Sequence, residues 1–371
     1  MQLLMIPGPV QLHERIIRAM ARQMIGHRTK EFSEILEYCV ERLKELFGTK
    51  HDVFIISGSG TAGMEAAIAS FSKVKRITCI DNGKFGDRFA KIASRYTEVD
   101  VVKFEWGKSI DLEAVERSLA EGSEAIAFVH NETSTGILNP AKEIAKIAKE
   151  YDALVIMDGI TSVGGEEVRM DEWKIDVAVV GSQKCIGAPP GLVAVAVNDR
   201  AWEFYNEKCP YYLDLNAYKK KMKDLQTPYT PAIPLFFALH EALKIIEEEG
   251  IENRIRRHRI FAEAVRTWAI EAGLELFPEL NEYSRYSNTV TAIKIPKGIT
   301  DKELREGVGE YGILISGGQD HLKGKIFRIG TMGNITKKDV LVTLMAIEEV
   351  LRRRNLIKPA IDSAIEVLRK L

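Results

Sequence analysis

Seven short apolar runs alternate along the chain with segments of helical character, up to residue 197. The runs are rich in β-branched residues, and most of them are apolar throughout. They lie at 52–56, 76–80, 99–104, 124–129, 154–157, 176–180 and 192–197. Strands of this kind are buried on both faces, which requires helices on each side of their sheet. The sequence therefore predicts an α/β fold with a mostly parallel, seven-stranded sheet.

The segments between the runs have the apolar spacing of amphipathic helices. We expect helices at 11–24, 30–47, 61–71, 85–95, 111–120 and 140–150. Asp111 is expected to open one of them, and Asn139 to cap the last, with Pro140 at its first position. Helical crossovers of this kind connect parallel strands.

The pattern changes after residue 198. Residues 199–224 are predicted to be helical, and a Pro- and Thr-rich break at 226–234 separates them from long helices at 235–249 and 251–272. The remainder indicates a smaller α+β unit, with strands near 289–295, 311–316 and 325–330 and helices near 301–309, 337–353 and 359–370. Thr300…Glu303 and Thr336…Asp339 have the spacing of capping boxes. We expect an N-terminal arm at 1–15, a large domain at 16–249 and a small C-terminal domain at 250–371.

The composition argues against several classes of function. The 371-residue chain has a formal net charge of -1 and no long basic run, so nucleic acid is not expected as a partner. No apolar run approaches membrane-spanning length and the N-terminus lacks a signal-peptide pattern, so we expect a cytoplasmic protein without a membrane partner. The four cysteines and seven histidines lack metal-ligand spacing, so no metal site is expected. Few glutamines and many charged helix residues favour a thermophilic source.

One lysine stands between two of the buried strands. Lys184 follows Gly181-Ser182-Gln183 and precedes a turn that contains Pro189 and Pro190. Desolvation lowers the pKa of a lysine and makes its neutral amine available for Schiff-base chemistry. The alternative is a lysine that extends to the surface at the end of a strand.

A second feature is Gly58-Ser-Gly-Thr-Ala-Gly63, a G-x-G-x-x-G sequence between a strand and a helix. With Asp81 at the end of the next strand, it matches the pattern of a dinucleotide-binding domain. A narrower interpretation is that the amides of Ser59, Gly60 and Thr61 bind one phosphate at a helix N-terminus. The turn can also open the helix and bind nothing. The residues of the turn leave these three interpretations open.

Two further polar residues stand at strand ends. Asp158 ends the strand before the one that leads to Lys184, so both side chains can reach the crevice where open α/β sheets bind ligands. An acid opposite a reactive lysine suits a cofactor with a basic ring nitrogen and a carbonyl, although an isolated aspartate more often caps a helix or turn. Arg328 ends a strand of the smaller unit, where it either holds a substrate carboxylate or forms an ion pair between domains.

Taken in order, these features resemble the fold-type I enzymes that use pyridoxal 5'-phosphate (PLP), and most closely the class V aminotransferases of the alanine–glyoxylate and serine–pyruvate branch. The matching segments are PGPV at 7–10, SGSGTAGMEAA at 57–67, NGKFGDR at 82–88, HNETSTGILNP at 130–140, MDGITSVGG at 157–165, GSQKCIGAPPGL at 181–192 and KIFRIG at 325–330. Each is weak alone, but together they span nearly the whole chain and are specific. The resemblance implies a PLP-dependent aminotransferase that moves the amino group of alanine or serine to glyoxylate or pyruvate by a ping-pong mechanism.

The resemblance also implies a role for each matching residue. Lys184 would bind PLP covalently and move the substrate α-proton, and Asp158 would pair with the ring nitrogen. The further cofactor contacts would be Ser59, Gly60, Thr61, Phe85, Thr133, Ile160 and Gln183, with Phe85 where this branch often has a tryptophan. Thr227 and Thr230 would reach the cofactor phosphate of a neighbouring subunit, which implies a homodimer with shared active sites. Arg328 would hold the substrate α-carboxylate, with Gly8 beside it.

The sequence does not determine which substrate the protein uses. Gly26-His27-Arg28 resembles the His-Arg pair of phosphoserine aminotransferases. Arg28 would either accept the side-chain carboxylate of an acidic donor such as aspartate or form a structural ion pair at a subunit contact. A cysteine desulfurase-like lyase is disfavoured because Gln183 stands where those relatives usually have histidine. An NAD-dependent dehydrogenase would leave the pairing of Asp158 with Lys184 unexplained, and an inactive scaffold would leave the intact cofactor positions unexplained.

Overall fold

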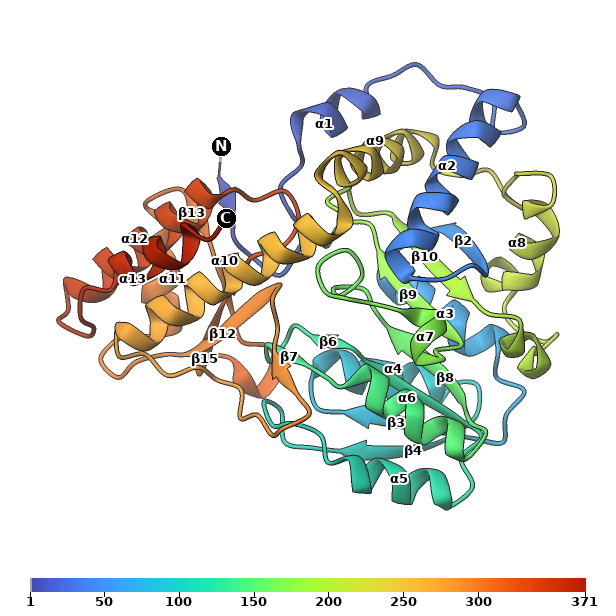
Figure 1. Ribbon diagram of the computed structural model, residues 1–371, viewed down its shortest axis with the longest axis horizontal. Coiled ribbons are helices and arrows are strands. Elements are labelled where there is room, and N and C mark those ends of the chain that lie inside the picture. Colours follow the sequence, from blue (N-terminus) through green and yellow to red (C-terminus); the bar gives the residue numbers. More distant parts are fainter. Residues whose placement is uncertain (1) are drawn as a thin grey trace.

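The apolar runs form the central sheet of the molecule, which a computed structural model describes over residues 2–371 (Figure 1). The strands are β2 (Asp52–Ser57), β3 (Arg76–Asp81), β4 (Glu98–Lys103), β5 (Ala125–Val129), β8 (Leu154–Asp158), β9 (Val177–Gly181) and β10 (Leu192–Val197). Their order in the sheet is β2-β10-β9-β8-β5-β3-β4. Strand β10 runs antiparallel to both neighbours, and the other neighbouring pairs are parallel. The predicted α/β fold with a mostly parallel, seven-stranded sheet is confirmed.

Helices cover both faces of this sheet because its strands are apolar on both sides. In β2, Val53 and Ile55 face one hydrophobic core, and Phe54 and Ile56 face the other. The first core is formed with α1 (Glu14–Met20), α2 (Lys30–Phe47), α5 (Leu112–Ala120), α6 (Ala141–Glu150) and α9 (Ile233–Glu249). The second core is formed with α3 (Gly60–Ser70), α4 (Lys84–Ala93) and α8 (Leu215–Met222). Parallel strands between two helical layers present their carboxyl ends at one edge, where ligands bind in folds of this kind.

The C-terminal third forms a second layered unit beside the first, at the left of Figure 1. Its antiparallel sheet has the order β12-β15-β14, and its fully buried Trp268 donates to Glu348 Oε2 at 3.0 Å. Both predicted capping boxes, Thr300 with Glu303 and Thr336 with Asp339, are present. The elements are α10 (Ile251–Glu271), β11 (Arg285–Tyr286), β12 (Val290–Lys294), α11 (Asp301–Gly309), β13 (Ile313–Leu314), β14 (Ser316–Gly317), β15 (Ile326–Gly330), α12 (Lys337–Arg352) and α13 (Ile361–Leu368). The division at residues 15 and 250 into an arm and two domains stays a prediction.

The N-terminal arm links the two units. Its strand β1 (Leu3–Leu4) pairs in parallel with β13, and Met5 is buried in the core of the C-terminal unit. The next residues run past Gly330, whose amide donates to the Met5 carbonyl at 2.9 Å. Val10 then donates to the carbonyl of Gln183 at 3.2 Å, in the turn that carries Lys184. The arm thus lies between the C-terminal sheet and the lysine turn.

Three local predictions were wrong. Residues 199–224 do not form a continuous helix but two short 3-10 turns, Arg200–Phe204 and Tyr211–Leu213, followed by the short helix α8. Pro210, which has no N–H, lies between the two turns. Asn139 does not cap α6, because its Nδ2 donates to the Val129 carbonyl at 2.8 Å and its Oδ1 accepts from Asn82 at 2.8 Å. The predicted strand 311–316 is split into β13 and β14, since β13 pairs with the arm and β14 pairs with β15.

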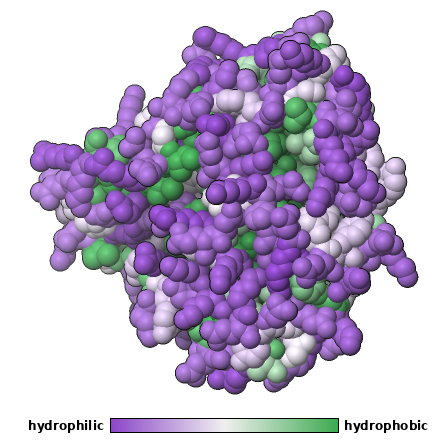
Figure 2. Space-filling view, turned by 45° about the vertical axis from the view of Figure 1, so that its right-hand side comes forward, coloured by the Kyte–Doolittle hydropathy of each residue, from purple (hydrophilic) through white to green (hydrophobic). Residues whose placement is uncertain are grey.

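The face of the molecule in Figure 2 is mostly hydrophilic, with scattered hydrophobic side chains between charged ones. Within residues 2–371, none of the helices combines the length and hydropathy needed to cross a membrane. The same residues contain no group of three or more His, Cys, Asp or Glu side chains arranged to hold a metal ion.

The contact between the arm and Gly330 can be tested by adding one methyl group. A Cβ at Gly330 would lie 2.1 Å from the Ile6 carbonyl oxygen, so Gly330→Ala must displace the arm. We expect the free energy of unfolding to fall by about 1–3 kcal/mol, measured by urea denaturation, with faster proteolysis of the arm. Gly309→Ala is the control, because nothing lies within 4 Å of its added Cβ. Equal stability of the two variants would contradict the close packing of the arm.

Candidate active site

Lys184 lies in the turn between β9 and β10, beneath the N-terminal arm. Its Nζ donates to the carbonyl oxygen of Pro7. Gly8, at a φ of 88°, packs so closely that a Cβ there would lie 2.7 Å from Lys184 Cδ and 2.8 Å from its Nζ. Burial is the main cause that lowers the pKa of the Lys184 amine to about 8. A substantial fraction of the amine is therefore neutral, and nucleophilic, near pH 8.

A buried arginine, Arg254, holds the turn that carries Lys184. Arg254 is 1% exposed and donates from Nη2 to the Cys185 carbonyl at 2.6 Å and from Nε at 3.2 Å. Its charge is balanced by Glu249, whose Oε2 accepts from Nη1 at 2.8 Å. Within the turn, Ser182 Oγ donates to the Pro189 carbonyl at 2.5 Å. These bonds fix the backbone on both sides of Lys184.

Asp158 ends β8, the strand next to β9, and is 3% exposed. Its Oδ1 accepts from the Ile160 amide at 2.8 Å. Burial is the main cause that raises the pKa of Asp158 to about 7. A nearby cation would lower this pKa again, so the site favours a positively charged partner opposite the carboxylate.

Lys184 and Asp158 line the same cavity, of about 200 Å³. Its walls come from the start of α3, from α4, from the segment after β5, from the end of β8 and from the lysine turn. The lining residues are Ser59, Gly60, Thr61, Phe85, Arg88, Val129, Asn131, Thr133, Asp158, Ile160, Thr161, Gln183 and Lys184. Nine of the residues predicted from the sequence are therefore brought together.

The glycine-rich turn presents free amides to this cavity. The amide N–H groups of Ser59, Gly60 and Thr61 have no partner in the described chain, and the Ser59 side chain does not cap α3. Such amides at a helix N-terminus bind a phosphate group. Asp81, the acid expected to hold a ribose in the dinucleotide interpretation, instead accepts from Trp106 Nε1 at 3.0 Å and does not line the cavity. The arrangement favours the binding of one phosphate.

Arg328 lies beside the cavity on β15. Its Nε and Nη2 donate to the Gly317 carbonyl at 3.0 and 2.8 Å, and its Nη1 donates to the Thr133 carbonyl at 2.9 Å. A guanidinium has five N–H donors, so one on each terminal nitrogen has no partner among residues 2–371. This pair suits a carboxylate, which accepts two parallel bonds from arginine. Burial lowers the pKa of Arg328 to about 10, which leaves it charged at neutral pH.

Glu132 was missed in the sequence and holds one wall of the cavity. It is fully buried, and its Oε2 accepts from the amides of Phe85 at 3.0 Å and Gly86 at 3.1 Å. The carboxylate therefore caps the start of α4 and fixes the backbone of Phe85.

Arg88 and Asn131 also line the cavity, although the sequence assigned no role to them. The Arg88 guanidinium lies 5.0 Å from the Phe85 ring centroid, and its Nη1 donates to Thr61 Oγ1 at 3.1 Å. Helical spacing could have identified Arg88 from the sequence, because it stands three residues after Phe85 and so lies on the same face of α4. The alternation of an extended segment could have identified Asn131, since Val129, Asn131 and Thr133 all face the cavity.

Arg28, Thr227 and Thr230 are not brought to the cavity of their own chain. The Arg28 guanidinium donates to the Thr227 carbonyl at 2.6 Å and to Gln226 Oε1 at 3.0 Å, and it forms no ion pair with any described residue. Thr227 is buried and its Oγ1 donates to the Tyr229 carbonyl at 2.7 Å, whereas Thr230 is exposed. Arg28 thus holds the segment that contains Thr227.

The residues of the cavity fit PLP. Two buried side-chain oxygens that line it, Oε1 of Gln183 and Oδ1 of Asn131, have no hydrogen-bond partner within the described residues. Unpaired buried polar atoms are uncommon and indicate a missing partner. Free amides for a phosphate, a carboxylate for a ring nitrogen and an amine for an aldehyde complete the set.

Known proteins share both the sequence and the fold of this chain. Residues 11–341 match the family model described as aminotransferase class-V. An uncharacterized aminotransferase of Methanocaldococcus jannaschii is 46% identical over 380 residues, covering 100% of this chain and 97% of that protein. The serine–glyoxylate aminotransferase of Arabidopsis thaliana is 34% identical and covers 94% of this chain and 90% of its own length. The crystal structure of ureidoglycine–glyoxylate aminotransferase from Bacillus subtilis superposes with a TM-score of 0.91 at 33% identity, covering 100% of this chain and 98% of that one.

The lowered pKa of Lys184 predicts how the cofactor-free protein reacts with PLP. The rate of covalent attachment should rise with pH around a midpoint near 8, because only the neutral amine attacks an aldehyde. Stopped-flow absorbance at a series of pH values measures this midpoint. A free lysine derivative serves as the control and should titrate near pH 10.4. A midpoint at or above pH 10 for the protein would contradict the burial of the amine.

Proposed function

We propose a specific reaction for this chain, which belongs to the class V aminotransferases. The family membership confirms fold type I, the cofactor PLP and the general activity, amino transfer between an amino acid and a 2-oxo acid. The finer proposal is that the donor is alanine or serine, that the acceptor is glyoxylate or pyruvate, and that the two half-reactions follow a ping-pong order. The observation that carries it is that Lys184 and Asp158 line one cavity and Arg328 lies beside it, with two N–H groups free.

The roles of the residues follow from where they lie. When bound, PLP supplies an aldehyde for amines and a ring that accepts the electrons left by removal of an α-proton. Asp158 would stay ionised against the ring nitrogen, and the amides of Ser59, Gly60 and Thr61 would hold the phosphate. Phe85 and Ile160, which line the same cavity, would contact the ring.

Once its amine is free, Lys184 would take the α-proton of the substrate and pass it to the cofactor in the first half-reaction, and it would move a proton in the reverse direction in the second. The Pro7 carbonyl, which accepts from Lys184 Nζ, keeps the amine inside the site while it is free. The two unpaired N–H groups of Arg328 orient the substrate carboxylate, so that the α-carbon faces Lys184.

The charges in the cavity support a donor with a small, neutral side chain. Lys184 and Arg88 are the only cationic residues among those that line it, and Arg88 is already bonded to Thr61 and packed over Phe85. Because Thr61 belongs to the turn assigned to the phosphate, this bond assigns Arg88 to that turn rather than to a second carboxylate. The names of similar proteins, serine–glyoxylate and ureidoglycine–glyoxylate aminotransferase, agree with glyoxylate as the acceptor.

We further propose a homodimer in which Thr227 and Thr230 complete the phosphate site of the partner subunit. Both lie away from the cavity of their own chain, and Arg28 holds the same segment. An aspartate donor is the alternative if Arg28 enters the partner subunit's site with them. A cytoplasmic location and a thermophilic source stay predictions from composition.

A cysteine desulfurase-like reaction is disfavoured by the structure around Cys185. This thiol is fully buried, and its Sγ lies 3.2 Å from the Thr161 carbonyl oxygen. Burial raises the pKa of the Cys185 thiol to about 12. A reactive cysteine needs an accessible thiolate, so Cys185 is a structural residue.

A panel of amino donors with glyoxylate, pyruvate and 2-oxoglutarate tests the proposed substrates. Alanine or serine with glyoxylate should give the highest kcat/KM. Arg328→Lys should lower kcat/KM by at least about 100-fold, mainly through KM, because an ammonium cannot form two parallel bonds to a carboxylate. Arg353→Lys, an exposed change at the C-cap of α12, is the control. Unchanged kcat/KM in Arg328→Lys would show that Arg328 does not hold the carboxylate, and a preference for large or acidic donors would refute the proposed donor class.

An experiment can show whether Arg28 supports the segment that contains Thr227 or binds the substrate. Since Arg28 donates to the carbonyls of Thr227 and Pro228, Arg28→Ala should weaken the affinity for PLP and lower alanine and aspartate activities by similar factors. Fluorescence titration with PLP and steady-state kinetics with both donors measure this. Arg18→Ala, which removes an exposed arginine paired with Glu14, is the control. Selective loss of aspartate activity, with PLP affinity intact, would instead assign Arg28 to the substrate.

A further inference from the structure

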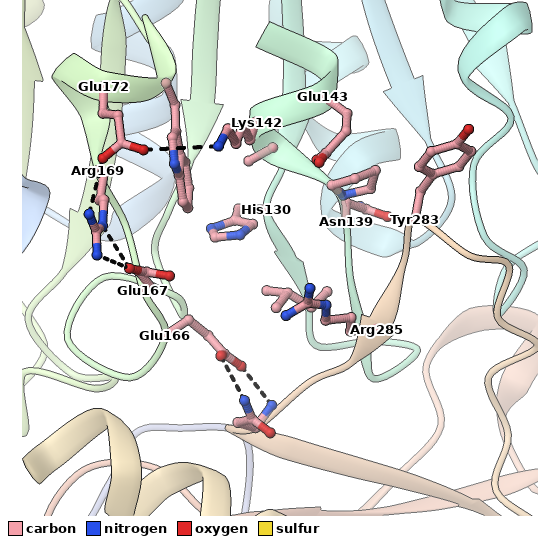
Figure 3. Close-up of a pocket in the computed structure, with 15 residues that line it drawn as sticks. His130, Asn139, Lys142, Glu143, Glu166, Glu167, Arg169, Glu172, Tyr283 and Arg285 are labelled. Carbon is pink, nitrogen blue, oxygen red and sulfur yellow. Dashed lines mark hydrogen bonds and ion pairs between the residues drawn. The ribbon is translucent and has the colours of Figure 1, made fainter. Parts of the chain in front are cut away.

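A second cavity, of about 460 Å³, is lined by residues that do not belong to the cofactor cavity (Figure 3). It is formed by the start of α6, by the segment around α7 (Met170–Trp173) and by the segment that contains β11. Its lining residues are His130, Leu138, Asn139, Pro140, Ala141, Lys142, Glu143, Glu166, Glu167, Arg169, Glu172, Trp173, Tyr283, Arg285 and Asn288. None of them lines the cofactor cavity.

The two cavities share a wall. Val129, Asn131 and Thr133 face the cofactor, whereas His130, in the same extended segment, faces the second cavity. The end of β8 and the segment after it also line both cavities. Asp158 and Thr161 line the cofactor cavity, and Glu166 lines the second one. The second cavity is therefore a separate site, one layer of backbone away from the reacting groups.

His130 is an unpartnered polar side chain in the middle of this cavity. It is 3% exposed, and its buried Nδ1 has no hydrogen-bond partner among residues 2–371. Figure 3 shows its imidazole between the residues of the α6 start, Arg285 and Glu166. Burial lowers the pKa of His130 to about 3, so the ring is neutral and carries one N–H donor. A buried ring nitrogen without a partner indicates a ligand that supplies one.

The N-terminus of α6 opens into the same space. The helix has 10 residues, and its first turn receives no side-chain cap, because Pro140 occupies the capping position. The amides of Lys142 and Glu143 have no partner in the part of the chain described here. Free amides at the positive end of a helix attract an anion.

The charged side chains that line the cavity are three cations, Lys142, Arg169 and Arg285, and four carboxylates, Glu143, Glu166, Glu167 and Glu172. Among the carboxylates, Glu166 accepts from the amide and Nδ2 of Asn288 at 2.7 and 2.8 Å. Glu167 and Glu172 both pair with Arg169, at 2.6 and 3.1 Å.

Lys142 lies 4.0 Å from Glu172 at an exposed site, which is a weak pair, and the Arg285 side chain has no partner within residues 2–371. Glu143 is the one lining carboxylate without a partner among the described residues. Lys142, Arg285 and the free amides of α6 are therefore the donors of this cavity that no close ion pair or backbone bond within residues 2–371 occupies.

We propose that this cavity binds a small organic anion through a carboxylate group. The carboxylate lies at the start of α6, between Lys142 and Arg285, and the His130 ring donates to the ligand or accepts from it. Binding does not depend on the identity of the amino donor, so the proposal stands or falls separately from the substrate assignment.

Malonate is the probe, titrated into the PLP-loaded enzyme at constant ionic strength and followed by tryptophan fluorescence. Trp173 lines the cavity and its ring centroid lies 5.7 Å from that of His130, so the signal should saturate and should vanish in Trp173→Phe. Lys142→Ala and Arg285→Ala should each raise the Kd at least tenfold. Lys146→Ala, an exposed lysine of the same helix outside the cavity, should leave it unchanged.

Arg328→Ala separates this site from the substrate site, since the Kd for malonate at the second cavity should not change. The absorbance of bound PLP verifies that each variant is folded. A signal that does not saturate, or a Kd that is equally affected by Lys146→Ala, would overturn the proposal. Saturation by inorganic phosphate but not by malonate would overturn the carboxylate assignment.

Discussion

The burial of the Lys184 amine is the constraint on which the rest of the site depends. A cationic lysine is costly to desolvate, so the amine is kept partly neutral, with a pKa near 8, and is given the Pro7 carbonyl as an acceptor. That contact requires Gly8, because a Cβ there would overlap the lysine side chain. It also requires the arm to be anchored at β13 and Gly330. The covalent site is therefore assembled from the central sheet, the lysine turn and the N-terminal arm together.

Charge balance around the lysine explains why the remaining groups lie where they do. Asp158 and Glu132 are buried acids, Arg328 is a buried cation and Arg88 is a partly buried one. Glu132 is satisfied by amides at the start of α4 and Arg328 by backbone carbonyls, so neither neutralises the other through a direct pair. Asp158 and two N–H groups of Arg328 are left for the cofactor and the substrate. Backbone hydrogen bonds thus stabilise the buried charges, and the groups without such partners remain available to bind the cofactor and the substrate.

Much of this could be predicted from the sequence because it depends on strand patterning. The apolar runs identify the seven strands, and parallel β8 and β9 bring Asp158 beside Val179, so that Asp158 and Lys184 reach one edge of the sheet. The contribution of Pro7 could not be predicted, since a backbone carbonyl has no sequence signature. Asn139 has the features of a helix cap, yet its side chain bonds to a strand carbonyl instead. The division of neighbouring residues such as His130 and Asn131 between two cavities depends on tertiary packing, which local patterns do not encode.

The central claim is that Lys184 carries PLP, and it can be measured directly. The purified protein should show a yellow absorption band that shifts when alanine is added and is absent in Lys184→Ala. Reduction with borohydride followed by peptide mass spectrometry should place the cofactor on the peptide that contains Lys184. A colourless protein with no affinity for PLP, or a label on another lysine, would contradict the account.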